Sequence, residues 1–335
     1  MNKIAKTVLM TGTALCAAGV VLSTAGYFAG GKDFTYTSDH MYVSGGNSSS
    51  RKNLTVMKKE QIDDFSKLNV NFENFDLDIR TSDDDHYMEY RLEKNGRKNP
   101  LTWKDKDGKL TLEESAGGSG SYYITYDLGV FSTHADLTEK KDALNTVILY
   151  IPEKAQLSEA ELQLSDGDLA ADQLLCKEMT LELLNGDMML DKGEFEKFDA
   201  KLSDGDMNVK EFQCTDNMQL KSGNGDVTIK KAELADGQIA LSDGDIQIDN
   251  SSFNGDMKIN SSCGDVSVEM KNGSAEKTNI YLKAADGDVD TEGLSGGRSD
   301  NEEDTSVYEN KAGASAPTLN VECSDGDITL TESEK

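Results

Sequence analysis

A Gly-Asp dipeptide returns along the second half of this 335-residue chain at an almost constant interval. Six copies follow one another in steps of 19, 19, 20, 19 and 20 residues, and two further copies begin at Gly287 and Gly326. A fixed period of about 20 residues is typical of a solenoid, in which each repeat forms one coil and the coils stack. The glycines of the six regular copies are Gly167, Gly186, Gly205, Gly225, Gly244 and Gly264.

Apolar residues keep fixed positions relative to these glycines. The positions two residues after the glycine, four residues after it and five residues before it are apolar in nearly every repeat, with Thr291 as an exception. Alternation of apolar and polar residues indicates half-buried strands. Because the apolar positions recur from repeat to repeat, the strands should stack at the sheet spacing of about 4.8 Å. The pattern therefore predicts an all-β fold, a β-solenoid (β-helix) of about 20-residue coils, in which each coil has at least two strands and two corners.

The Gly-Asp dipeptides should form corners of this solenoid. Glycine supplies the positive φ angle that a tight corner needs, and aspartate bonds to the turn backbone. Stacking would align the carboxylates in a ladder, and carboxylate oxygens are ligands that calcium prefers. We favour turn capping over calcium binding, because the nonapeptide period and paired glycines of calcium-binding β-rolls are absent. The ladder comprises Asp168, Asp187, Asp206, Asp226, Asp245 and Asp265, followed by Asp288 and Asp327.

Residues 1–31 differ from everything that follows them. Lys3 and Lys6 precede an uncharged run, which at about 1.5 Å per residue is long enough to cross a bilayer as one helix. Lysines on the short leading side place the N-terminus in the cytoplasm. We therefore expect residues 8–29 to be a transmembrane helix of a single-pass cell-membrane protein with an extracellular C-terminal part. The alternative is a signal segment cleaved after Ala25, which would give a secreted protein.

Composition divides the rest of the chain into three parts. Residues 32–53 are polar and predict a flexible linker. Residues 54–155 contain strand-like pieces without the regular period, so we expect irregular first coils and an N-terminal cap there. Residues 156–335 carry the regular solenoid repeats, with a loop insertion at 290–316 that lacks the apolar positions. The final coil should resume near Leu319 and end at Leu330.

Polar residues of the chain do not suggest a reaction centre. The three histidines, His40, His86 and His134, are scattered in polar segments. A carbohydrate-active β-helix would need one local pair of carboxylates, whereas the acids here recur in every repeat. The net charge of −28 argues against a nucleic-acid partner, because phosphates need a basic surface. We expect no enzymatic activity, no catalytic residue and no cofactor.

The five cysteines are expected to be unpaired. Cys176 and Cys214 share one column two coils apart, which separates them by about 9.6 Å at the sheet spacing. A disulfide needs Cα atoms within about 7 Å of each other. We therefore predict buried thiols at Cys176, Cys214, Cys263 and Cys323, and a membrane residue at Cys16.

Three features together resemble a known bacterial family, the "putative adhesin" family of unknown function, which is built from Gly-Asp β-strand repeats. They are the N-terminal apolar segment, the Thr-Val-Ile-Leu-Tyr-Ile-Pro segment at 146–152 and the Ser-Asp-Gly-Asp coils. The resemblance covers roughly residues 60–332, and it departs from the family pattern in the 290–316 insertion and in the Ser-Ser-Cys-Gly-Asp variant at 261–265. It implies a β-solenoid on the outside of the cell, and it attaches no catalytic residues.

These expectations combine into one hypothesis about function. The chain should be a non-enzymatic extracytoplasmic β-solenoid protein that serves as an adhesin or a cell-envelope interaction module, with cell-wall or surface ligands as partners. One alternative is a β-helical carbohydrate-active enzyme. Another is an accessory protein of an envelope-stress pathway.

Overall fold

The computed structural model describes residues 34–36, 41–43, 54–116 and 144–334, apart from 292–293, 295–296 and 303–304. The chain divides into two units. The described part of the first unit is a short antiparallel pair, β1 (Phe34–Tyr36) and β2 (Met41–Val43). The predicted anchor at 8–29 lies outside the described residues. Within the described part of the chain, none of the helices has the length and apolar character needed to cross a bilayer.

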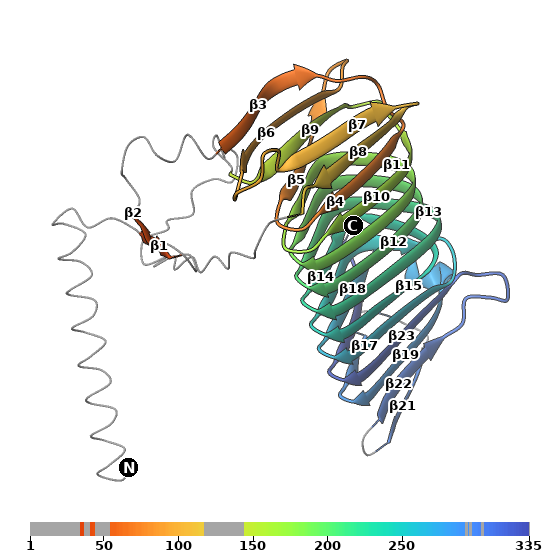
Figure 1. The fold of residues 1–335 in the computed structure, drawn as a ribbon. Helices are drawn as coiled ribbons and strands as arrows, with labels where there is room; N and C mark the ends of the chain where they lie inside the picture. Colours follow the sequence, from red (N-terminus) through yellow and green to blue (C-terminus); the bar gives the residue numbers. More distant parts are fainter. Residues whose placement is uncertain are drawn as a thin grey trace, which may run out of the picture. The chain divides into compact units, whose positions relative to one another are not determined.

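The second unit, residues 54–116 and 141–335, contains a stack of parallel coils. Its regular part runs through β10 (Leu157–Leu164), β11 (Leu169–Asn185), β12 (Met188–Asp204) and β13 (Met207–Asn224). It continues through β14 (Val227–Lys230), β15 (Ala232–Asp243), β16 (Ile246–Phe253), β17 (Met257–Cys263) and β18 (Val266–Met270). Equivalent residues of successive coils pair in register, which confirms the predicted repeat (Figure 1). One such buried column contains Leu162, Leu181, Ala200, Leu220, Ile239 and Ile259.

A regular coil has three inward-facing segments, one more than the minimum that the sequence predicts. In β11 the first segment buries Leu169 and Ala171, the second Leu174 and Cys176, and the third Met179, Leu181 and Leu183. The 20-residue coil that starts at Gly205 accommodates its additional residue in a β-bulge at 215–216, where Cys214 and Asn217 of β13 stand opposite Phe195 and Lys197 of β12. Bulges of this kind absorb one residue while the flanking ladder continues.

Aromatic rings fill the centre of the regular coils. The rings of Phe195, Phe198 and Phe212 lie 5.0–5.4 Å apart between centroids, and all three are buried. Gly193 faces the same core, and a Cβ atom there would come within 2.6 Å of Phe195 and Leu190 side-chain atoms. The absence of a side chain at Gly193 therefore leaves room for the ring cluster. Phe253 is buried as well.

At both ends of the stack, the order of the coils differs from their order in the sequence. At the N-terminal end, β4 (Lys67–Phe72) and β5 (Asp76–Ser82) pair with β10 and β11. The later strands β8 (Lys109–Glu114) and β9 (Thr146–Pro152) pair with the outer side of β4 and β5. The coil that comes second in the sequence is therefore the outermost one.

The C-terminal end shows the same inversion. Strands β23 (Thr318–Asp325) and β24 (Ile328–Glu332) pair with β17 and β18, and β19 (Asn279–Asp286) and β20 (Val289–Asp290) pair with the other side of β23 and β24. A short 3-10 helix, η2 (Ala275–Lys277), precedes β19. The predicted final coil of the chain at 319–330 is confirmed as β23 and β24, but in space it lies between two other coils.

Antiparallel strands cover both outermost coils. At the N-terminal end, β7 (Leu101–Lys106) pairs with β8, β6 (Tyr87–Glu93) with β9, and β3 (Leu54–Gln61) with β6. At the C-terminal end, β22 (Thr305–Asn310) pairs with β19, and β21 (Arg298–Glu302) with β22. The segment 290–316, expected to be a loop insertion, contains this hairpin. Such strands end the parallel stack, whose open edges would otherwise invite pairing with another chain.

Candidate functional site

The aspartates of the Gly-Asp corners form one continuous ladder of hydrogen bonds. The backbone N–H of each aspartate donates to the Oδ1 atom of the aspartate in the neighbouring coil, with N···O distances of 2.8–3.0 Å. The ladder runs in the order Asp76, Asp168, Asp187, Asp206, Asp226, Asp245, Asp265, Asp327 and Asp288. Its last two members repeat the inverted coil order.

The glycines beside this ladder stack closely on one another. A Cβ atom at Gly225 would lie 2.2 Å from the carbonyl oxygen of Gly205, and the φ angle of Gly225 is 114°. Phe75 takes the place of the glycine in the first coil. Its carbonyl oxygen would likewise lie 2.2 Å from a Cβ atom at Gly167. Both residues of the dipeptide therefore serve the corner: glycine permits the close approach, and aspartate accepts an amide of the adjoining coil.

A second column of side chains runs beside the ladder, two residues before each ladder aspartate. Asn185 donates from Nδ2 to Asp166 Oδ1 at 2.7 Å, and Asn224 donates in the same way to Asp204. Alternation of amide and carboxylate avoids direct stacking of like charges. In coil order the column reads Asp166, Asn185, Asp204, Asn224, Asp243, Cys263, Asp325 and Asp286.

The two columns make one corner of the solenoid acidic. The carboxylates from Asp168 to Asp327 in the ladder are exposed, and none of them forms a salt bridge within the described part of the chain. Across the described residues, no group of three or more His, Cys, Asp or Glu side chains is arranged to hold a metal ion. The contacts that the ladder does make are hydrogen bonds from a backbone N–H of one coil to a carboxylate of the next.

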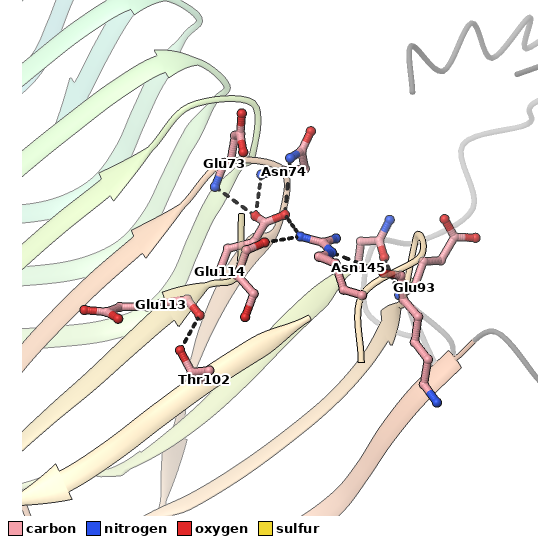
Figure 2. Close-up of polar contacts among 10 residues, drawn as sticks. Glu73, Asn74, Glu93, Thr102, Glu113, Glu114 and Asn145 are labelled. Atoms are coloured by element: carbon pink, nitrogen blue, oxygen red, sulfur yellow. Dashed lines mark hydrogen bonds and ion pairs between the residues drawn. The ribbon is translucent and has the colours of Figure 1, made fainter. Parts of the chain in front are cut away.

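A buried ion pair closes the N-terminal end of the stack (Figure 2). Arg97 Nη1 lies 2.8 Å from Glu114 Oε1, and the two side chains are 7% and 2% exposed. Glu114 Oε2 accepts the backbone N–H groups of Glu73 and Asn74 at 2.8 and 2.6 Å. The chain leaves the stack where β8 ends, so the described part of the outer coil has no carbonyl opposite the amides of Glu73 and Asn74. The Glu114 carboxylate is the acceptor for both amides.

Arg97 is held by further contacts. It donates to the carbonyl oxygens of Ser115 at 2.8 Å and Lys94 at 3.2 Å, and its guanidinium lies 5.4 Å from the ring centroid of Phe75. Sequence reasoning missed this network, because Glu114 is 40 residues from Asn74 in a part of the chain without a regular period. The network is structural in character: Glu114 binds the backbone of the first coil, and Arg97 joins Glu114 to the segment between β6 and β7.

Cysteine positions agree with the sequence except at one residue. Cys176 and Cys214 are buried and form no disulfide. Phe195 of the intervening coil lies between them in the same column of paired residues. Burial raises the pKa of Cys176 to about 12 and that of Cys214 to about 11. Cys323 is buried too, but Cys263 is exposed, so its predicted burial is wrong. Cys263 occupies the column of Asp243 and Asp325, which faces solvent at the corner.

Among the histidines, only His86 lies in the described part of the chain. Its ring is buried beside Phe65, and Nδ1 lies 3.0 Å from Asp64 Oδ1. His40, His134 and Cys16 lie outside the described residues.

The sequence of this chain matches the model of a known family. The sequence model of the family described as Toastrack DUF4097 matches residues 65–331. No curated protein matches the chain. The structure of a putative adhesin from Parabacteroides distasonis ATCC 8503 is 16% identical, with 84% of this chain and 97% of that chain covered and a TM-score of 0.45.

Two further solved structures are similar in the same degree. A putative adhesin from Parabacteroides merdae ATCC 43184 is 15% identical, with 86% of this chain and 98% of that chain covered and a TM-score of 0.44. A putative lipid binding protein from Parabacteroides distasonis ATCC 8503 is 12% identical, with 85% and 98% covered and a TM-score of 0.44.

Proposed function

Because this chain belongs to the Toastrack DUF4097 family, we propose that it is a non-enzymatic, adhesin-like interaction module displayed on the outer face of the cell membrane. The family match covers the coils and most of both caps, so the proposal concerns the whole described solenoid. Residues 8–29 would hold the solenoid at the membrane, as the uncharged run behind Lys3 and Lys6 predicts.

The observation that carries the proposal is how the coils use their carboxylates. From Asp76 to Asp327, each ladder aspartate accepts a backbone amide of the adjoining coil, so the acids that recur in every repeat serve the corner. A carbohydrate-active β-helix would instead concentrate two carboxylates at one place. A regular, stacked surface suits repeated contact with a ligand better than it suits a single reaction centre.

Two of the buried thiols are compatible with display outside the cell, whereas the exposed Cys263 would be open to oxidation there. Protonated, buried thiols are poor nucleophiles, because the thiolate is the reactive form. The high pKa values of Cys176 and Cys214 would therefore protect these residues in an oxidising compartment.

Protease added to intact protoplasts that carry the full chain tests the proposed topology. We expect digestion of residues 32–335, detected with an antibody against the C-terminal coils. Protection of these residues would contradict the proposal, and a mature N-terminus near Gly26 would show cleavage and release. Intact cells with the chain should also retain isolated cell-wall fragments better than cells that lack it.

A further inference from the structure

One face of the N-terminal cap carries a pair of tyrosines. Strands β5, β9, β6 and β3 lie side by side there (Figure 1). Val147 and Leu149 of β9 point into the core, so Tyr150, which follows Leu149, lies on the opposite face. Tyr87 of β6 lies directly opposite Tyr150 where β6 and β9 pair. The two ring centroids are 6.4 Å apart, and the rings are nearly perpendicular at 88°.

Acidic residues hold both tyrosines in place, together with Arg80, which stands opposite Tyr150 in β5 and is itself paired with Asp78. Tyr150 donates its hydroxyl hydrogen to Glu89 Oε1 at 2.6 Å, and Tyr87 donates to Asp85 Oδ2 at 3.3 Å. Desolvation and the carboxylates of Asp85, Asp84 and Asp83 raise the pKa of Tyr87. The rings are thus preorganised next to a loop of negative charge, which favours the approach of a cation.

An ammonium group of the chain itself already occupies this pair of rings. Lys59 Nζ lies 3.5 Å from the ring centroid of Tyr150 and 4.8 Å from that of Tyr87. Lys59 sits in a β-bulge of β3, where Met57 and Glu60 stand opposite Tyr90 and Met88. A bulge re-aims side chains. Within the described residues Lys59 forms no salt bridge, so its ammonium is held by ring faces.

We propose that the Tyr87–Tyr150 pair is a binding site for a primary alkylammonium group of a ligand, and that Lys59 is its exchangeable internal occupant. Ring faces attract cations through their quadrupole, and the attraction is largest where the cation sheds water. Lysine has a flexible stem of four carbons, so Lys59 can leave the rings while β3 stays paired with β6. The short distance to Tyr150 suits an ammonium with three hydrogens better than one with three methyl groups.

This inference rests on the proposed function, since it names the chemistry that the displayed surface recognises. Its test uses purified full-length protein, so a negative result here leaves the protoplast experiment unaffected. Conversely, protection from protease in protoplasts would refute display of the cap without touching the binding measurement.

The test is a titration with butylammonium chloride at constant ionic strength, followed by NMR of ring-labelled tyrosines. Lys59→Gln empties the site, and we expect its Kd to be about fivefold lower than that of the unmodified protein. Lys58→Gln, one residue away, removes the same charge without emptying the site and should keep the original Kd. Adding Tyr150→Leu to Lys59→Gln should abolish saturation, whereas Tyr150→Phe, which keeps the ring, should retain it.

Equal Kd values for the Lys59→Gln and Lys58→Gln variants would overturn the proposal, because charge alone would then explain any binding. Absence of saturable binding in Lys59→Gln would overturn it as well. Tetramethylammonium chloride is the second ligand. Binding of this ion in preference to butylammonium would refute the assignment to a primary ammonium group.

Discussion

The glycines of the Gly-Asp corners from Gly205 onward are fixed by contact and by backbone angle, whereas Gly167 and Gly186 are fixed by contact alone. At Gly225 the φ angle of 114° disfavours any L side chain, and the carbonyl oxygen of Gly205 occupies the place of a Cβ atom. Gly273, in the turn after β18, also has a positive φ angle, of 74°, but no atom lies within 4 Å of a Cβ placed there. Gly273 therefore shows the effect of the backbone angle alone, whereas Gly225 combines it with the close approach of the neighbouring coil.

This comparison gives a prediction on stability. Gly273→Ala should cost about 1 kcal/mol, because only the left-handed backbone angle opposes the methyl group. Gly225→Ala should cost at least about 3 kcal/mol, since strain and overlap with a backbone oxygen act together. Urea unfolding followed by circular dichroism measures both values. Similar losses for the two variants would show that the corners are not packed as described.

Thiol reactivity is a second property decided at single residues. At pH 8, Cys263 should react quickly with iodoacetamide, because its side chain is exposed. Cys176 and Cys214 have pKa values raised to about 12 and about 11, so they stay protonated and inert from neutral pH to about pH 9. Mass spectrometry of the alkylated peptides should find label on these two residues only after unfolding. Rapid labelling of Cys176 in the native protein would contradict its place in the core.

On the scale of the element, the aspartate ladder balances repulsion against hydrogen bonds. Carboxylates about 4.8 Å apart repel each other by roughly 1 kcal/mol in water. Each carboxylate also accepts one amide of the next coil, and a charged acceptor makes such a bond stronger than a neutral one. The alternation of Asn and Asp from Asp166 to Asp243 in the neighbouring column separates the carboxylates of that column from one another.

Substitution at Asp245 tests the capping role of the ladder. Asp245→Asn keeps an oxygen near the Asp265 amide and lowers repulsion, so the melting temperature should change little. Asp245→Ala removes the acceptor and should cost about 1 kcal/mol. Sodium and calcium chloride at equal ionic strength should raise the melting temperature modestly and alike, through screening. A large, saturable rise with calcium alone, lost in Asp245→Asn, would make the ladder an ion-binding site.

The N-terminal cap depends on contacts of a different kind. Arg97 and Glu114 form a buried pair that also satisfies backbone groups of the first coil. Removal of one partner from such a pair is costly, because the other charge is left buried. The tyrosine face of the same cap has its charges near solvent, so it can exchange partners while the buried pair keeps the sheet in place.

Over the whole molecule, the interleaved ends give the clearest prediction. Removal of residues 318–335 takes away an interior coil, since β23 and β24 lie between β17–β18 and β19–β20. We therefore expect residues 279–310 to lose protection from hydrogen exchange in the truncated chain, although they are still present. Stacking in sequence order would leave them protected. Retained protection would thus contradict the inverted order.

The sequence predicts the register of the regular coils well and the spatial order of the coils at the two ends less well. The apolar columns identify the register of the regular coils, because each column must remain buried from coil to coil. The order at the ends is not encoded in these columns: Ile280 and Leu282 of β19 match Leu319 and Val321 of β23 in kind and spacing. Either coil could pack on β17, and only the connections between them decide.

The residues of the candidate site also include some that the sequence predicts and some that it does not. The ladder aspartates were predictable, since their function as caps repeats with the period. Glu114 and Arg97 were not, because their contacts join segments that share no repeat. Burial of Cys263 is predicted from its position among the small residues that line a coil, but its column faces solvent, and this place decides its exposure.

The inverted order also has a mechanical consequence. The last described strand of the chain, β24, has a partner strand on each side, β18 and β20, and β23 before it likewise lies between β17 and β19. Tension applied at the C-terminus cannot peel away an outer strand one bond at a time. The tension must draw a coil out from between its two neighbouring coils, so that hydrogen bonds on both sides share the load. In the surface role that we propose, a load on the C-terminus would therefore be borne by strands inside the stack.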